Sequence, residues 1–242
     1  MGNAVRNITS INKPAKQKFS FIIPAAGQGS RMKSYGIKSL IKLNGETLIE
    51  RQLRQISHGF SNCEIIVVTG FESNRLVRRL PSYVKTIENK FFLQTNVAYS
   101  IGLGLTIAKT DNIVIMYGDL VFNQETLIAP FHQESTLLID SYGLMKNDEV
   151  GCILEKNMVR NMMYGLPNKW GQIIFITGHE LRLFKEQMVN KNSYRHLGFE
   201  IINSIISNGG KFKAVKPKNM MITDIDTSKD ITTGKLICQK ES

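Results

Sequence analysis

A glycine-rich stretch near the start of the chain could form a cradle for phosphate groups. It reads PAAGQGSRM and follows an apolar run that is typical of a buried strand. Gly27 and Gly29 would let the backbone approach a ligand closely, so that its N–H groups face phosphate oxygens. Arg31 and Lys38 follow and could neutralise phosphate charge. The stretch lacks the G-K-[ST] ending of a Walker A motif, and Met32 stands where G-x-G-x-x-G needs its third glycine. The alternative interpretation is an ordinary strand-to-helix turn.

Three aspartates could bind a divalent cation beside this loop. Asp119 follows a fully apolar run, and a carboxylate at the end of a buried strand suits a hard cation that also binds phosphate oxygens. Asp224 and Asp226 would point the same way on an extended segment. The alternatives are a turn or helix N-cap for Asp119 and a helix start at Thr227. Because ligands bind beyond the carboxyl ends of parallel strands, we expect Asp119 and Asp226 to converge beside the glycine loop and to support metal-assisted chemistry on a nucleotide.

The elements that would position these residues alternate between strand and helix over the first half of the chain. The apolar patterns predict strands at 18–27, 63–70, 84–89 and 112–122, and helices at 47–58, 74–83 and 97–110. This order favours a mainly parallel sheet covered by helices on both faces. After residue 123 the segments are shorter and mostly strand-like, which predicts a small mixed or antiparallel extension. Helices return at 179–190 and 199–210, before a last strand at 212–217.

Composition limits the class of protein. The 242 residues suit one α/β domain at 18–242 after a mobile basic leader at 1–17. The net charge of +11 favours anionic partners, but the cations follow no nucleic-acid-binding motif. No apolar run is long enough to span a membrane. Three widely spaced cysteines argue against a zinc site or a disulfide framework, and they favour a cytoplasmic setting. The oligomeric state stays open.

Four stretches together resemble the nucleotidyltransferase superfamily of sugar-phosphate and cytidylyl transferases. They are PAAGQGSRM, IKSLIKLNGETLIERQL, YGDLVF and ITDIDTSKD. A fifth, NKFFLQTNVAYSIGLGL, resembles the N-P-F-Y-x-x-T-N-N-x-x-S-L segment of phosphocholine cytidylyltransferase-like members. It matches at Asn89, Phe91, Thr95, Asn96 and Ser100. The chain departs from the family pattern where isoleucine replaces the proline before the signature lysine, phenylalanine replaces a tyrosine and valine replaces the second asparagine.

The resemblance implies a Rossmann-like, GT-A type three-layer sandwich and a set of site residues. The residues that would contact the nucleotide are Ala25, Ala26, Gly27, Gly29 and Arg31, with Gln94 and Asn96 near the base or ribose. Arg31 and Lys38 would be catalytic, with Lys38 on phosphate at the transfer site. Asp119 and Asp226 would hold Mg²⁺, and Asp224 is the alternative for the second ligand.

The implied reaction transfers a nucleotidyl group, most simply CMP from CTP, to a small phosphorylated acceptor such as phosphocholine or a sugar phosphate. Pyrophosphate leaves, and Mg²⁺ is required. The alternatives are uridylyl or guanylyl transfer to a sugar 1-phosphate, and a catalytically silent relative that binds a nucleotide or polyanion. No general base is needed, and the four histidines are expected to be structural or exposed. Tyr142, Tyr164 and Trp170 could cage a choline group, but we expect core or rim positions for Tyr164 and Trp170. Arg31 and Lys38 are expected to face solvent, so that truncating either lowers kcat without loss of stability.

Overall fold

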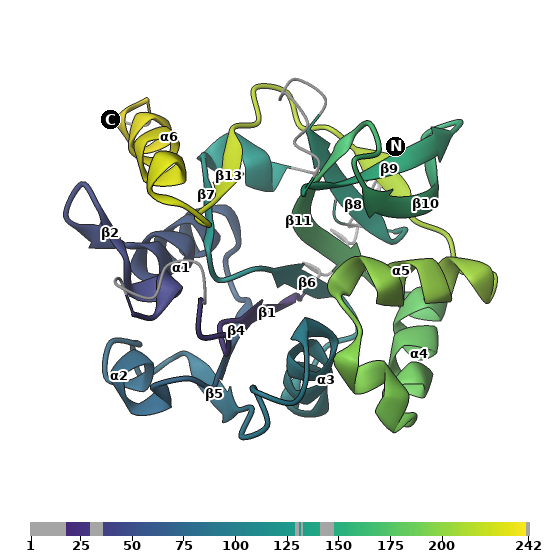
Figure 1. Cartoon of the computed structure of the whole chain (residues 1–242), viewed down its shortest axis with the longest axis horizontal. Coiled ribbons are helices and arrows are strands. Elements are labelled where there is room, and N and C mark those ends of the chain that lie inside the picture. Colours follow the sequence, from purple (N-terminus) through teal and green to yellow (C-terminus); the bar gives the residue numbers. More distant parts are fainter. Residues whose placement is uncertain (1–17, 30–35, 129–130, 132, 141–147, 241–242) are drawn as a thin grey trace, which may run out of the picture.

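The computed structural model describes residues 18–29, 36–128, 131, 133–140 and 148–240. Its centre is a nine-stranded sheet in the order β5-β4-β1-β6-β11-β8-β12-β10-β9 (Figure 1). The strand bounds are Lys85–Glu88 (β5), Glu64–Thr69 (β4), Ser20–Pro24 (β1), Ile113–Met116 (β6), Lys169–Ile176 (β11), Thr136–Asp140 (β8), Lys213–Val215 (β12), Met158–Tyr164 (β10) and Val150–Glu155 (β9).

Helices cover both faces of this sheet and give the expected three layers. The helices α1 (Leu48–Gly59) and α2 (Ser73–Val77) contribute to one core cluster, and α3 (Val97–Ile107), α4 (Gly178–Gln187) and α5 (Gly198–Ser207) contribute to the other. Strand β1 serves both clusters, because successive side chains of a strand point to opposite faces. Phe21 and Ile23 pack on the α1 side, and Ile22 packs on the α3 side. The helices and strands predicted up to residue 110 are therefore present, although the second helix is shorter than predicted and ends at Val77.

The parallel sheet expected from the first half of the chain is present, but the strands after residue 123 add more than a small extension, so the main sheet as a whole is mixed. Strands β5, β4, β1 and β6 are parallel, and so are β8 and β12. Strand β11 is antiparallel to both β6 and β8, and β10 is antiparallel to β9 and β12. For β9 and β10 the physical reason is the short connection, since a tight turn joins antiparallel neighbours whereas parallel neighbours need a crossover. Lys156 and Asn157 make such a turn between β9 and β10, with φ of 49° and 65°.

The strand predicted at 112–122 is divided into two. Strand β6 ends at Met116, and β7 (Leu120–Phe122) leaves the main sheet to pair with β13 (Ile222–Asp224) in a separate two-stranded sheet. The helix α6 (Ser228–Gln239) packs beside this pair, and its Ile237 shares a small core cluster with Val121. The helix start predicted at Thr227 is also present, because Asp230 and Thr227 form a capping box. Asp119 therefore lies in a turn between two strands.

Three 3₁₀ helices and one short hairpin complete the described elements. The 3₁₀ helices are η2 (Lys38–Leu40), η3 (Gln124–Ile128) and η4 (Lys191–Arg195), and the hairpin joins β2 (Lys42–Leu43) to β3 (Glu46–Thr47). None of the helices in the described ranges is both long and apolar enough to cross a bilayer. The predicted leader, residues 1–17, lies outside the described residues.

Candidate active site

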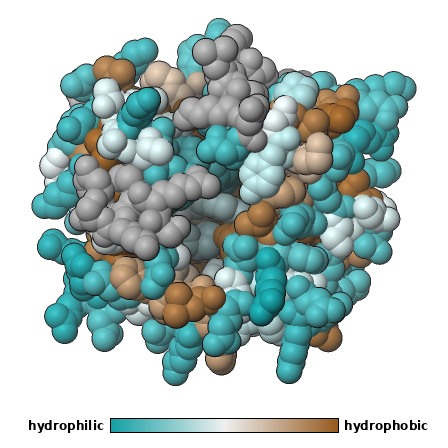
Figure 2. Space-filling view, in the orientation of Figure 1, coloured by the Kyte–Doolittle hydropathy of each residue, from teal (hydrophilic) through white to brown (hydrophobic). Residues whose placement is uncertain are grey.

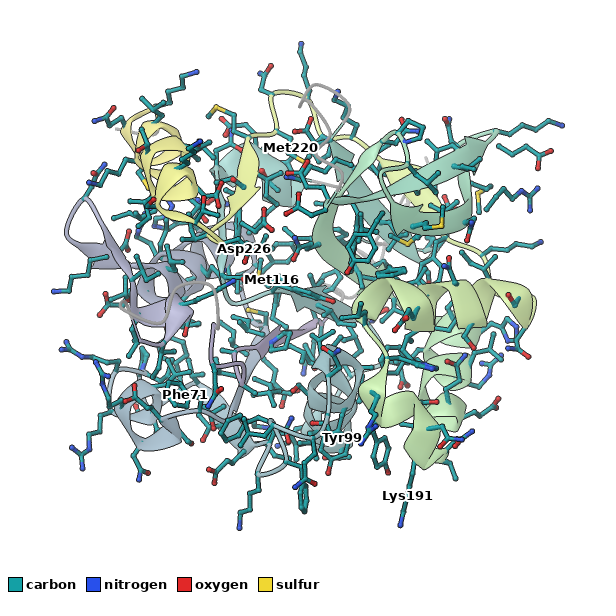
Figure 3. All side chains as sticks on the ribbon, viewed as in Figure 1. Phe71, Tyr99, Met116, Lys191, Met220 and Asp226 are labelled. Carbon is teal, nitrogen blue, oxygen red and sulfur yellow. The ribbon has the colours of Figure 1, made fainter. Side chains whose placement is uncertain are left out.

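The ammonium group of Lys38 joins two carboxylates that lie far apart in the sequence. Its Nζ donates to Asp119 Oδ2 at 3.0 Å and also to Asp226 Oδ1. The Lys38 side chain is 17% exposed, so the expectation that it faces solvent is wrong. Lys38 opens η2, which follows the glycine loop, whereas Asp226 precedes α6. The predicted convergence of Asp119 and Asp226 is therefore present, and Figure 3 shows Asp226 toward the middle of the molecule.

The pairing of β7 with β13 delivers the two carboxylates to the same place. Leu120 lies opposite Asp224 in this ladder, and the backbone N–H of Ile225 donates to the Asp119 carbonyl at 3.0 Å. Asp226 is the next residue along the chain. The local two-stranded sheet thus brings together positions more than a hundred residues apart.

Charge and burial oppose each other in this cluster. Burial works to lower the pKa of Lys38, but its attraction to Asp119 and Asp226 and its hydrogen bonds to them outweigh burial and raise that pKa. Burial raises the pKa of Asp119, and the nearby carboxylates add to the shift against the opposing effect of Lys38. The lysine therefore stays charged, and the acidic groups depend on a cation beside them.

Asp224 has partners of its own. Its Oδ2 accepts from Gln172 Nε2 at 3.1 Å, and its Oδ1 lies 3.7 Å from Lys169 Nζ. Lys169 in turn donates to Glu149 at 2.6 Å. These contacts hold Asp224 beside the Lys38 cluster without making it part of that cluster. Neither Lys169 nor Gln172 could be recognised from the sequence, because β11 has the pattern of a buried strand and only its register shows which polar side chains reach the site.

The glycine loop and the Lys38 cluster border the same cavity, which has a volume of about 260 Å³. Of the residues predicted to contact nucleotide, the structure places these on its wall: Ala25, Ala26, Gly27, Gly29 and Asn96. Gly29 has a φ of +60°, and an added Cβ would lie 2.9 Å from Lys38 Cγ. Gln94 is exposed and is not on this wall, and Arg31 lies outside the described residues. Asn96 also caps α3, because its side chain accepts from Val97 N.

A second cavity of about 790 Å³ lies on the other side of the cluster. It shares Lys38 and Asp119 with the first, whereas Asp226 lines only the larger of the two. Figure 2 shows this face of the molecule hollowed near its centre. The aromatic residues on its wall are Tyr117, Tyr164, Trp170 and Phe199. The acidic residues there are Asp119, Asp148, Glu149, Asp224, Asp226 and Asp230, against two lysines, Lys38 and Lys169. This acidic wall contrasts with the net charge of +11 for the whole chain.

The two aromatic residues named from the sequence occupy core and rim positions, as expected. Trp170 is 4% exposed and packs edge-on against Tyr117, whereas Tyr164 is 47% exposed and packs edge-on against Phe199. Tyr142 lies outside the described residues. None of the four histidines is among the residues that line these two cavities.

The donor set suits a magnesium ion bound through few protein ligands. Among the described residues, no group of three or more His, Cys, Asp or Glu side chains is arranged around a common metal position. Asp119 and Asp226 nevertheless converge on one cation, that of Lys38. Mg²⁺ is commonly held by one or two carboxylates together with substrate phosphates and water. The hard oxygen donors of Asp119 and Asp226 fit this mode.

Comparison with known proteins identifies relatives of this chain in sequence and in structure. Residues 21–140 match the model of the MobA-like NTP transferase domain. Bifunctional protein GlmU of Ruthia magnifica subsp. Calyptogena magnifica is 27% identical over 214 residues, which are 82% of this chain and 46% of that protein. The chain spans less than half the length of the first such relatives.

Two solved structures share the fold over nearly the whole chain. The inositol-1-phosphate CTP transferase from T. maritima has a TM-score of 0.74 and 16% identity, covering 92% of this chain and 97% of its own. The CTP:phosphocholine cytidylyltransferase from Streptococcus pneumoniae has a TM-score of 0.74 and 16% identity, covering 91% and 99%. The fold is that of the GT-A-like α/β nucleotidyltransferases.

Proposed function

Because the chain belongs to the nucleotidyltransferase superfamily, we propose that it transfers CMP from CTP to a small phosphorylated acceptor and releases pyrophosphate. The observation that carries this proposal is the Lys38 cluster, where Asp119 and Asp226 meet between a glycine-lined cavity and a larger acidic one. The smaller cavity would take the nucleotide, and the larger would take the acceptor. The reacting phosphates would then meet at the cluster.

The reaction forms one P–O bond and breaks another. An oxygen of the acceptor phosphate attacks the α-phosphorus, and the bond to the β-phosphate oxygen breaks as pyrophosphate leaves with the electron pair. The acceptor phosphate is ionised near neutral pH, so no residue has to remove a proton. Lys38 and Arg31 would stabilise the charge that develops on the transferring and leaving groups. Mg²⁺, when held by Asp119 and Asp226, would neutralise phosphate charge in the same place.

The wall of the larger cavity supports an acceptor with a cationic end group. Tyr164 and Phe199 present aromatic surface there, and Asp148 lies on the same wall. Aromatic rings and carboxylates together favour quaternary or primary ammonium groups. Phosphocholine is therefore the first acceptor to test. Sugar phosphates come second, since Glu149 and Asp224 could accept hydrogen bonds from their hydroxyl groups.

The test measures pyrophosphate release with each of the four ribonucleoside triphosphates, Mg²⁺ and a panel of phosphorylated acceptors. We expect release above background with CTP and an amino-alcohol phosphate, and CTP should also raise the melting temperature most. Asp119→Asn should abolish release, because an amide keeps the shape but does not neutralise a metal ion. Asp224→Asn is the matched control and should lose less pyrophosphate release, since the Asp224 carboxylate already contacts Gln172 and Lys169. Equal stabilisation by all four nucleotides would contradict the choice of CTP.

A silent, binding-only relative predicts a different result. It would be stabilised by a nucleotide and would release no pyrophosphate with any acceptor of the panel. Release that is lost in Asp119→Asn would exclude that alternative.

A further inference from the structure

The turn that carries Asp119 is fixed on one side by the loop after β1. It runs from Tyr117 to Leu120 and is closed by the Leu120 N–H, which donates to the Tyr117 carbonyl at 3.3 Å. The Gly118 N–H donates to the Pro24 carbonyl at 3.2 Å. A Cβ added at Gly118 would lie 3.0 Å from Ala25 Cβ, so the turn is already in close contact with the loop.

The other side of the turn is held by a single buried amide from α1. Gln52 is fully buried, and its Nε2 donates to the carbonyl of Tyr117 at 2.9 Å and to that of Leu120 at 2.9 Å. These two residues are the first and last of the turn, so one NH₂ group spans it. Both partners are carbonyl oxygens, which accept only, and this fixes the nitrogen as the atom that faces them.

The oxygen of the same amide makes no hydrogen bond with the residues that the structure describes, so only the nitrogen can account for the burial of this polar group. Gln52 Oε1 is buried and has no hydrogen-bond partner among the described residues. An unpaired buried acceptor is destabilising. The side chain therefore contributes to stability through the two hydrogen bonds that its Nε2 donates, and both of these go to the turn.

We infer that Gln52 is a positioning residue that sets the place of the Asp119 carboxylate. It is fully buried and is not among the residues that line the two cavities, so it acts through the turn and not on the substrate. The inference rests on the proposed function, in which Asp119 holds the metal ion. Groups that orient a metal ligand typically change metal affinity or activity by about 10–100-fold when they are removed.

The chain offers a matched control on the same helix. Gln55 is 1% exposed, and its Nε2 donates to the Phe122 carbonyl at 2.7 Å. Residue type, burial, helix and kind of acceptor are therefore the same as for Gln52. The difference is the place of the acceptor, since Phe122 ends β7 and lies beyond the turn.

The experiment compares Gln52→Met with Gln55→Met in the full chain. Methionine keeps the length of the side chain and removes the donors. Binding of Mn²⁺ alone is followed by electron paramagnetic resonance, together with kcat, the KM for nucleotide and thermal unfolding. We expect both variants to lose stability. Gln52→Met alone should weaken Mn²⁺ binding by about tenfold or more, with a fall in kcat and little change in KM. Gln55→Met should stay within about twofold of the wild type in Mn²⁺ affinity, a difference smaller than the range for orienting groups.

A milder variant keeps the test open if Gln52→Met does not fold. Gln52→Asn retains the amide but is too short to span both carbonyls, so it should show the same weakening of Mn²⁺ binding. Wild-type Mn²⁺ affinity in a folded Gln52 variant would overturn the inference, and so would equal weakening by Gln55→Met. In either case pyrophosphate release by the wild type would leave the proposed function standing. A wild type that neither binds Mn²⁺ nor releases pyrophosphate would remove the proposed function and this inference with it.

Discussion

Single side chains set the electrostatics of the site, and Lys38 is the residue on which both carboxylates depend. Its ammonium group is their shared hydrogen-bond donor, and the Lys38 and Asp119 side chains are mostly buried. A divalent cation bound by the same carboxylates would compete with this lysine. The stability of the protein and its response to metal are therefore linked through one residue.

Lys38→Ala should separate these effects. The variant removes the hydrogen bonds that the ammonium group donates to both carboxylates, so we expect a loss of about 1–3 kcal/mol in the free energy of unfolding. Saturating MgCl₂ should restore more stability to the variant than it adds to the wild type. Turnover should fall by about 10²-fold or more, because charge stabilisation is greatest in the transition state. Urea unfolding with and without MgCl₂, at constant ionic strength, measures the first two effects. Equal gains from MgCl₂ in both proteins would contradict the shared site.

Gly27 permits a test of the nucleotide cradle that leaves the empty protein unchanged. A Cβ added there would meet no atom of the described residues within 4 Å. Gly27→Ala should therefore keep the melting temperature of the wild type. If backbone and phosphate approach closely at this point, the methyl group should raise the KM for nucleotide by about tenfold. The KM for the acceptor serves as the internal control and should not change. An unaltered nucleotide KM would place the phosphates elsewhere.

At the scale of elements, the turn between β6 and β7 depends on a glycine for its contact with the β1 loop. In Gly118→Ala the new Cβ would lie 3.0 Å from Ala25 Cβ and 3.1 Å from the Pro24 carbonyl. Backbone atoms yield less than side-chain ends, so we expect the turn to shift, at a cost of about 1–3 kcal/mol in stability. Because Asp119 moves with the turn, kcat should fall.

Gly102→Ala is the control for this prediction. Its Cβ would meet Met188 Sδ at 2.9 Å, and a flexible methionine side chain can move aside. Urea unfolding and pyrophosphate release are measured for both variants. A Gly118→Ala enzyme with full kcat would show that the turn does not set the position of Asp119.

The elements also show how far the sequence could predict the fold and the site. Apolar periodicity predicts β1, α1 and β4 because each buries one continuous run or stripe. It does not predict the break between β6 and β7, since both are apolar throughout and the change of partner depends on β13, a hundred residues later. The sequence predicts a mixed or antiparallel extension but not that its strands continue the main sheet, because strand pairing depends on residues far apart in the chain.

Some residues of the candidate site could likewise be predicted from the sequence, and others could not. The glycine loop, Lys38, Asp119 and Asp226 are visible in the sequence, because their types and their places after apolar runs suggest phosphate and metal chemistry. Gln52 is not visible, because glutamine on a helix with polar neighbours reads as a solvent-facing residue. Its burial follows from the packing of α1 against β7. The roles of all the predicted site residues stay predictions.

At the scale of the whole molecule, the proposed site and a structural hydrogen-bond network around Glu64 lie at opposite edges of the main sheet. The proposed site lies beyond the carboxyl ends of β1 and β6, whereas Glu64 begins β4 at the opposite edge. Glu64 Oε2 accepts from Ser20 Oγ at 2.6 Å and from the Lys109 N–H at 2.9 Å, and Oε1 accepts from Lys85. One carboxylate thus joins β1, β4, β5 and the segment before β6.

The pKa of Glu64 gives this network a defined pH dependence. Burial alone would raise that pKa, but the hydrogen bonds from Lys85, Ser20 and the Lys109 N–H outweigh burial and lower it. A carboxyl group whose pKa is lower in the folded state stabilises the protein above the unfolded-state value of about 4.3. That contribution is lost as the pH falls through the folded-state pKa.

Glu64→Gln should therefore lower the free energy of unfolding by about 1.5–3 kcal/mol at neutral pH, the range for hydrogen bonds to charged groups. The difference from the wild type should shrink as the pH falls below the unfolded-state value of about 4.3 and through the lower folded-state pKa, where the folded carboxyl becomes protonated. Urea unfolding of both proteins from neutral to acidic pH measures this difference in the free energy of unfolding. Glu155→Gln is the control, because the Glu155–Arg160 pair is 59% and 57% exposed and should contribute little. Pyrophosphate release by Glu64→Gln at neutral pH should match that of the wild type, because the site lies at the other edge. A stability difference independent of pH would show that Glu64 acts through packing and not through its charge.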